Sequence, residues 1–498
     1  MMMLGSPGPY AVVETSPLRL STAQMLAVAS AVIALLVLSV LVAGPFLSYA
    51  VLVLMMVGFA IIRNPVLSVL SYVVINTVLT LRPKEYGGGG AAPSVLDFML
   101  GLCLAGVMAY WIVRIRIVEQ QPLSRSREQL YMMLFAVWGL IGTGIGFLTG
   151  GNNLFNSAIR ELLNFTPLLI LPIIYERYIE TDSSEEHVLM WAVVVAGCLM
   201  LVWNALTMRS NILRAAYLYQ TGRATTDQEL SGFLTLIAVS FLMSLRRSRW
   251  LIPFAIVFLA GCFSIVISMF RGLYIATAIS MVCMLFSGDR AERRRGISRI
   301  GLAVGSGVLL LIPIIESSRL FRLLLMGFAN RMLSTQHLGT DLSLFNRYVE
   351  WRYEWNVILH APLFGYGFGS LWRVWDALLG FHTWIGFSHS SYLFLLLKSG
   401  LVGFCLFFLA YFGFMRNGYR LLRSPRLSET SRAIVRAGIA FLLFILIDAY
   451  TSPVFDSKTD LVWVGLIWGY FLALEKSLGM RGHLIEQKPA LLTAKPIT

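Results

Sequence analysis

The sequence predicts an all-α integral membrane protein, and three observations support this fold class. Only 13% of the 498 residues are charged, about half the share of a typical soluble protein. The apolar residues fall in blocks of roughly 17–25 residues, which is the length that crosses about 30 Å of hydrocarbon as a helix. Blocks such as 24–44 and 297–315 lack the apolar–polar alternation of barrel strands. Helices also satisfy their own backbone hydrogen bonds in lipid.

About fourteen of these blocks, and at least about eleven, are predicted to span the membrane. Their approximate ranges are 24–44, 46–62, 65–81, 94–113, 130–149, 159–176, 187–207, 229–245, 250–269, 272–287, 297–315, 389–415, 433–451 and 460–475. The chain then divides into a cytoplasmic tail (1–23), transmembrane helices 1–11 (24–315), a large periplasmic loop (316–388), helices 12–14 (389–475) and a C-terminal cytoplasmic tail (476–498).

A net charge of +14 could suggest a nucleic-acid partner, but the positive-inside bias of membrane proteins accounts for it, so we expect no nucleic-acid partner. The basic residues lie at the ends of the apolar blocks. Dense arginine clusters occur in 114–127, 246–249, 290–299 and 416–432, and all of them fall on one side when the spans alternate. The positive-inside rule makes this side cytoplasmic and puts both termini there, so we expect a multi-pass protein of the plasma membrane.

The predicted loop 316–388 is unusually long and rich in aromatic residues. Loops longer than about 12–15 residues are usually functional or disordered. This one contains five tryptophans, and such a composition opposes disorder. Four of the six histidines lie in the loop and at its exit: His337, His360, His382 and His389. We therefore expect a structured loop at the membrane interface that carries function.

Arginines on this outer side predict a site for an anion. Arg347 lies in the loop, and Arg271 lies between two long apolar runs near the outer end of a predicted span. Arg214 and Arg223 lie earlier in the chain, in the outer connection before the predicted span 229–245. An arginine fork donates two hydrogen bonds and stays charged, which suits a pyrophosphate. The alternative for each arginine is contact with lipid headgroups or pairing with an acidic neighbour.

A set of motifs runs from the loop into the next span in a specific order. Arg347 is followed by Trp351, then by Pro362, Gly365 and Gly367 in a Pro-x-x-Gly-x-Gly pattern. His389 opens the next span, and Gly400 and Gly403 follow on it. This order resembles the superfamily of O-antigen ligases and O-antigen polymerases, which are bacterial inner-membrane glycosyltransferases. The resemblance covers 345–405 closely and 268–275 loosely, and it departs at Ser390, where members usually have asparagine.

The resemblance implies a reaction at the periplasmic face. A glycan on an undecaprenyl pyrophosphate carrier would be moved to an acceptor hydroxyl on lipid A-core or on another glycan, without a metal or another cofactor. It implies catalytic roles for His389, Arg347 and Arg271, of which His389 would orient or deprotonate the acceptor. Substrate binding would involve Arg214, Arg223, Trp351, Gly365 and Gly367.

Two other functions are compatible with the sequence. A polymerase of O-antigen or exopolysaccharide would use the same chemistry and differ in its acceptor. A transporter or flippase for lipid-linked oligosaccharides would also have many spans. Transporters often contain two related halves with broken helices in matching positions, and no such repeat is visible here.

Overall fold

A computed structural model describes most of the chain from residue 109 onward. The described residues are 64–66, 68–70, 109–123, 125–148, 155–181, 228–246, 251–268, 270–317, 342–376 and 380–480, together with the single residues 191, 195, 198, 202, 322, 326, 328 and 329. The four predicted spans between 24 and 113, and the span 187–207, lie almost entirely outside the described residues.

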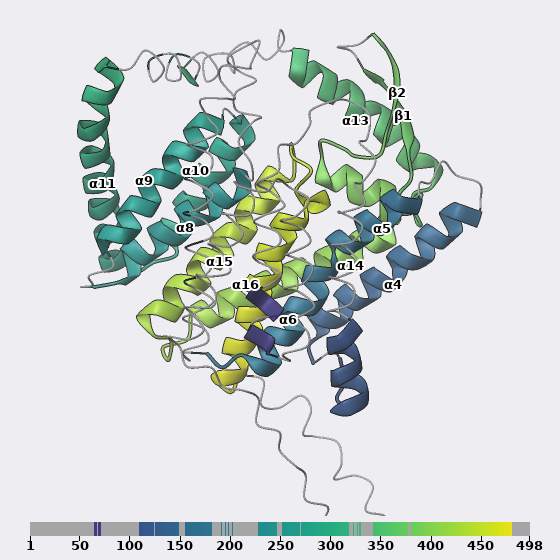
Figure 1. Ribbon diagram of the computed structural model, residues 1–498, viewed down its shortest axis with the longest axis horizontal. Coiled ribbons are helices and arrows are strands. Elements are labelled where there is room, and N and C mark those ends of the chain that lie inside the picture. The colour runs from purple at the N-terminus through teal and green to yellow at the C-terminus, as the bar shows by residue number, and fades with distance from the viewer. Residues whose placement is uncertain are drawn as a thin grey trace, which may run out of the picture.

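The described part of the chain is mostly helical (Figure 1). A π-helical turn, η1, covers Arg114–Val118. The α-helices are α4 (Arg127–Leu148), α5 (Phe155–Asn164), α6 (Thr166–Tyr178), α8 (Gln228–Ser244), α9 (Leu251–Ser268), α10 (Arg271–Phe286), α11 (Arg290–Ser317), α13 (Leu342–His360), α14 (Ser391–Leu422), α15 (Glu429–Asp448) and α16 (Lys458–Ser477). A 3-10 turn, η5, covers Val454–Asp456 in the connection between α15 and α16 (449–457), here called the α15–α16 connection.

Six segments of the described chain are long and apolar enough to cross a membrane: 127–148, 157–178, 251–268, 290–313, 391–422 and 429–448. Helices α8 and α10 are apolar but shorter. Ten spans are predicted from 130–149 to 460–475, and one of them, 187–207, lies almost entirely outside the described residues. Each of the other nine coincides with a described helix or, in the case of 159–176, with the helix pair α5 and α6. The described part of the chain is thereby confirmed as mostly helical, with helices long and apolar enough to span a membrane, whereas the total of about fourteen spans and the periplasmic loop stay predictions.

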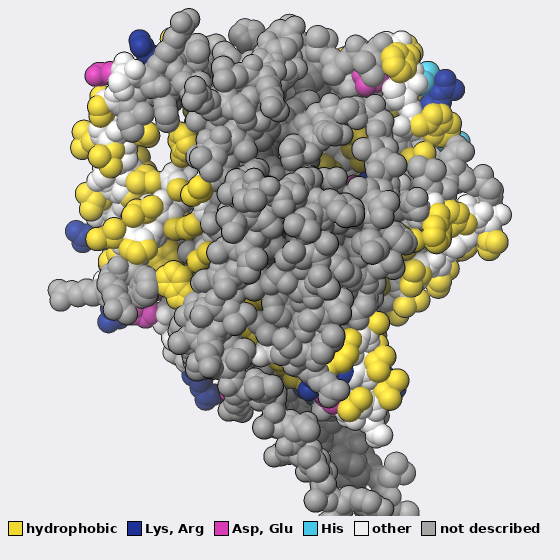
Figure 2. Space-filling model, viewed as in Figure 1, with side chains coloured by type: hydrophobic (Ala, Val, Ile, Leu, Met, Phe, Trp, Pro, Cys, Tyr) yellow, Lys and Arg dark blue, Asp and Glu magenta, His cyan; other side chains and the backbone are white. Residues whose placement is uncertain are grey.

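The bundle separates helices that form the interior from helices that face outward. α14 packs along α4, α16 along α6, and α8 between α9 and α15. In the apolar part of α15, 67% of the residues are buried, against 17% in α11. Figure 2 shows hydrophobic side chains exposed along the flanks where α11 and α4 lie, and residues such as Leu130, Leu302 and Leu309 contribute to these surfaces. Such surfaces are expected where helices contact lipid.

The described arginine clusters meet at one end of the bundle, as the charge pattern predicts. Arg432 and Arg436 at the start of α15 both pair with Glu292 near the start of α11. At the same end, Arg416 of α14 lies 3.8 Å from Glu128 at the start of α4, and one further pair, Arg420–Glu475, joins α14 to α16 at 3.6 Å. The segment 342–390 lies at the opposite end, over α14 and α4 (Figure 1).

The all-α prediction needs one addition, a two-stranded hairpin in this segment. Strands β1 (Trp372–Asp376) and β2 (Phe381–Ile385) pair antiparallel, with Val374 opposite Thr383. Trp372 and Val374 pack with Ile358 of α13 and Leu397 of α14 in a small apolar cluster. The described part of the long loop is therefore ordered as a helix and a hairpin that are attached to α14.

Candidate active site

One face of α13 carries the polar residues of the site. Arg347, Glu350, Trp351 and Glu354 recur at intervals of three and four, so they lie on the same side of the helix. This side packs against the residues that precede α14 and against the α15–α16 connection. Glu350 and Glu354 are buried, whereas Trp355 outside this face is exposed.

His389 lies two residues before α14 and pairs with Glu350. The His389 Nδ1 atom is 2.7 Å from Glu350 Oε2. The His389 backbone N–H donates to the other oxygen, Oε1, at 2.9 Å. About a third of the His389 side chain is exposed (32%), against 7% for Glu350. The carboxylate thus fixes both the backbone and the ring of a histidine that remains open to an incoming molecule.

The two predicted catalytic arginines both lie beside the start of the α15–α16 connection. Arg347 donates to the carbonyl oxygen of Thr451 at 3.1 Å, and the buried side chain of Asp448 lies nearby. Arg271 is the first residue of α10, and the next residue, Gly272, packs on the same segment. A Cβ atom added to Gly272 would lie 2.6 Å from Thr451 Oγ1 and 3.0 Å from Asp448 Oδ1. Segments far apart in the sequence therefore bring the two arginines to one region.

Trp351 lies against the same connection. Its ring meets that of Tyr450 edge-on, with centroids 5.3 Å apart. The indole nitrogen of Trp351 is enclosed and has no hydrogen-bond acceptor among the residues that the structure describes. An enclosed N–H without an acceptor costs free energy, which a ligand oxygen can recover. This observation is compatible with the predicted binding role of Trp351.

The predicted glycines Gly365 and Gly367 lie where the loop crosses a break in α14. Their φ angles are +68° and +80°, in the left-handed region that favours glycine. Gly400, which interrupts α14 with a φ of +62°, lies against Gly365, whereas Gly367 packs on the backbone of α4 at residues 142 and 143. The loop then uses the freed backbone groups, since Tyr366 N–H donates to the Leu397 carbonyl at 2.8 Å. Close packing explains these glycines, and their predicted role in substrate binding stays a prediction.

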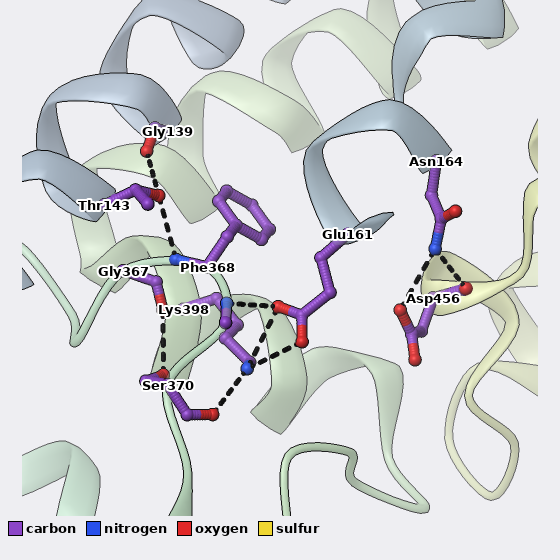
Figure 3. Close-up of polar contacts among 10 residues, drawn as sticks. Gly139, Thr143, Glu161, Asn164, Gly367, Phe368, Ser370, Lys398 and Asp456 are labelled. Atoms are coloured by element: carbon purple, nitrogen blue, oxygen red, sulfur yellow. Dashed lines mark hydrogen bonds and ion pairs between the residues drawn. The ribbon is translucent and has the colours of Figure 1, made fainter. Parts of the chain in front are cut away.

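A buried ion pair lies beside this crossing (Figure 3). Lys398 of α14 is completely buried and its Nζ is 3.0 Å from Glu161 Oε2 of α5. The same ammonium group donates to the Ser370 carbonyl at 2.8 Å, and Glu161 accepts the Gly369 N–H at 2.8 Å. These bonds join α5, α14 and the loop. Lys398 also lies over the ring of Trp372, 5.1 Å from its centroid, which ties the hairpin to the same joint.

The structure brings together His389, Arg347 and Trp351 of the predicted site, and places Arg271 beside the same connection. Arg214 and Arg223 lie outside the described residues. The sequence analysis considered acidic neighbours of the arginines, which include Glu350 and Glu354, only as pairing partners, and it did not single out Glu161. The signal for the two α13 acids was their spacing from Arg347 on one helix face, whereas the Glu161 contact spans 237 residues of sequence and left no local pattern.

Among the described residues, no group of three or more histidine, cysteine, aspartate or glutamate side chains is arranged to hold a metal ion. The metal-independent reaction that the resemblance implies stays a prediction. Comparisons with protein-family models and with curated proteins found no match to this chain. The geometry and the motif order are thus the basis for assigning a function.

Proposed function

We propose that the chain is a membrane glycosyltransferase of the O-antigen ligase type, which moves a glycan from an undecaprenyl pyrophosphate carrier to an acceptor hydroxyl at the periplasmic face. The observation that carries the proposal is the His389–Glu350 pair, 2.7 Å long and partly open, on the helix face that also carries Arg347. A carboxylate-held histidine beside an arginine combines a general base with a group that stabilises a departing phosphate.

His389 is the base in this proposal. When Glu350 accepts a hydrogen bond from Nδ1–H, the other ring nitrogen, Nε2, is left to take a proton. The acceptor hydroxyl loses its proton to Nε2 as its oxygen bonds to the anomeric carbon of the donor sugar. The bond between that carbon and the phosphate oxygen breaks at the same time. Glu350 then stabilises the imidazolium that forms, and the carrier pyrophosphate leaves with the electron pair.

The arginines neutralise the leaving group. Arg347 and Arg271 lie beside the same short connection, and their charges are fixed at neutral pH. A pyrophosphate that departs in a poorly hydrated site gains most from preorganised charged donors. Trp351 supplies an enclosed indole N–H close to this position, which fits an oxygen of the sugar or the phosphate. Outward-facing apolar helix surfaces provide the contact with the polyprenyl tail and membrane lipid.

The acceptor decides between a ligase and a polymerase. A ligase uses lipid A-core or another final acceptor, and a polymerase uses a second carrier-linked glycan. Deletion of the gene separates the two, because a ligase mutant accumulates long chains on the carrier. A polymerase mutant leaves single repeat units on the final acceptor, and a gel of the surface glycan distinguishes the two patterns.

Transfer by the purified protein tests the proposal. Wild type in lipid nanodiscs receives a carrier-linked glycan and either acceptor, and His389→Ala is compared with His360→Ala, whose exposed histidine lies at the end of α13. We expect transfer by wild type and by His360→Ala, with or without EDTA, and only a small residual rate by His389→Ala. Near-normal transfer by His389→Ala would overturn the assignment of the base. Translocation of the donor without any transfer would instead indicate a flippase.

A further inference from the structure

A second carboxyl group, Glu354, lies one helical turn beyond Glu350 on α13. None of its side chain is exposed (0%). Its Oε2 accepts a hydrogen bond from Ser388 Oγ at 2.8 Å. Its Oε1 is enclosed and has no hydrogen-bond partner among the described residues. An ionised carboxylate in this position would leave one oxygen without a donor in a dry environment, which is costly.

The neighbours of Glu354 also disfavour its charge. Burial raises the pKa of Glu354 well above its ordinary value, and the nearby negative charge of Glu350 raises it further. The hydrogen bond from Ser388 acts in the opposite direction. The nearby indole N–H of Trp372 does so as well, although its geometry does not meet that of a hydrogen bond. The direction of the pKa shift and the unbonded oxygen both favour the protonated form of the Glu354 carboxyl group.

Ser388 connects Glu354 to the catalytic histidine. The Ser388 hydroxyl donates to Glu354 and accepts the N–H of Ser390 at 3.0 Å. His389, between these two serines, is held by Glu350 through its ring and its backbone. Glu354 and Glu350 of α13 therefore hydrogen-bond to the consecutive residues Ser388 and His389, just before α14 begins. A shift of Glu354 would move the histidine that follows Ser388.

We propose that Glu354 is a positioning residue of the transfer site, with a proton on Oε1 that it donates in a hydrogen bond to the carboxylate of Glu350. The bond holds Glu350 in the orientation that accepts Nδ1–H of His389. It also leaves Glu350 as the single negative charge beside the imidazole. A second negative charge there would hold the proton taken from the acceptor on His389 too strongly. This inference rests on the proposed function.

The test compares two substitutions at the same position. Glu354→Gln keeps the shape, offers an N–H to Glu350 and still accepts from Ser388. Glu354→Leu keeps only the volume. We expect kcat of Glu354→Gln to stay within about threefold of wild type. For Glu354→Leu, kcat should fall roughly tenfold or more with little change in the KM for the donor, because one hydrogen bond to a charged group is lost. Glu350→Gln, which removes the charge that Glu354 supports, should fall at least as far.

Three results would overturn the inference. They are a Glu354→Gln protein as impaired as Glu354→Leu, unchanged kcat in a folded Glu354→Leu protein, or equal activity of Glu350→Gln and wild type. If the leucine variant does not fold, Ser388→Ala removes the hydroxyl link without a change of charge, and normal activity in it would count against the arrangement.

Infrared spectroscopy gives a readout that does not depend on transfer. At neutral pH, wild type should show the carbonyl band of a protonated carboxylic acid, and Glu354→Gln should lack that contribution. Identical spectra would contradict a protonated Glu354 even in an active protein. Absence of transfer by wild type with a normal infrared difference would instead contradict the proposed function and leave the proton assignment intact.

Discussion

His389 and Lys398 belong to the same part of the chain and have opposite surroundings. Each is a basic residue at or within α14 that pairs with a glutamate from another helix, at 2.7 Å for His389–Glu350 and 3.0 Å for Lys398–Glu161. The histidine keeps 32% of its surface exposed, whereas the lysine keeps none. The first pair can meet a substrate, and the second is closed off by the loop that crosses α14.

This difference separates a site for chemistry from a joint that positions it. The Lys398–Glu161 pair also bonds Ser370 and Gly369, so it attaches the loop to α5 and α14. The His389–Glu350 pair attaches α13 to the entrance of α14 and leaves one ring nitrogen for reaction. Substitutions in the buried pair should therefore lower stability, and substitutions around the open pair should lower transfer with stability nearly unchanged.

The largest effect is expected from Lys398→Met. Among the described residues, the substitution leaves the buried Glu161 with the Gly369 N–H as its one remaining hydrogen-bond donor. Loss of one member of a buried ion pair costs about 3–5 kcal/mol of stability. Thermal unfolding in detergent should show a strongly lowered midpoint or no folded protein. The double variant Lys398→Met with Glu161→Leu should recover much of the loss. A single variant as stable as wild type would show that the joint is not held by this pair.

Arg347→Lys tests the other half of the comparison, the expectation that substitutions around the His389–Glu350 pair lower transfer and not stability. Lysine keeps the charge but cannot reproduce the planar fork, so transfer should fall by about 10²- to 10³-fold while the unfolding midpoint stays near that of wild type. Arg352→Lys, at an exposed position on the same helix, is the matched control and should be active. Initial rates with a carrier-linked donor measure both. Wild-type turnover in Arg347→Lys would assign Arg347 a structural role only.

The smallest effect concerns the pH dependence of stability at Glu354. Because the pKa of this group is raised in the folded protein, the folded state binds more protons than the unfolded state above about pH 4.3. The free energy of unfolding should therefore fall as pH rises from about 4.3 toward the raised pKa of Glu354. In Glu354→Gln, the contribution of this group to the pH dependence of stability should be absent. Unfolding midpoints measured between pH 5 and 8 give the comparison. Equal slopes in both proteins would contradict a raised pKa at Glu354.

Sequence patterns predicted the helices better than the contacts between them. Apolar blocks such as 429–448 are recognisable because lipid and the core both require apolar side chains over the full length of a span. The hairpin 372–385 was missed, since two five-residue strands in an aromatic loop give little periodic signal. The break at Gly400 was missed as well. Its left-handed backbone is explained by the loop that packs against it, and loop packing is a tertiary property.

The same contrast between local patterns and tertiary contacts applies to the candidate site. Its individual residues could be named from the sequence, but the contacts between them could not. Arg271 was singled out because an arginine between apolar runs is conspicuous in a membrane protein. His389 and Arg347 were singled out through the order of the motifs, and the catalytic roles of all three stay predictions. Their partners could not be assigned from sequence, because Glu350 is 39 residues from His389, and Thr451 is 104 residues from Arg347. Such pairings depend on how α13 is laid over α14 and α15.

A double-mutant cycle on His389 and Glu350 tests the central claim most directly. Transfer rates are measured for His389→Ala, Glu350→Gln and the double variant, each checked for folding by its unfolding midpoint. If the two residues act as one unit, both single variants lose most of the activity and the double variant is no worse than His389→Ala within about threefold. Losses that multiply in the double variant would show that the residues act independently, which contradicts a base held and oriented by Glu350.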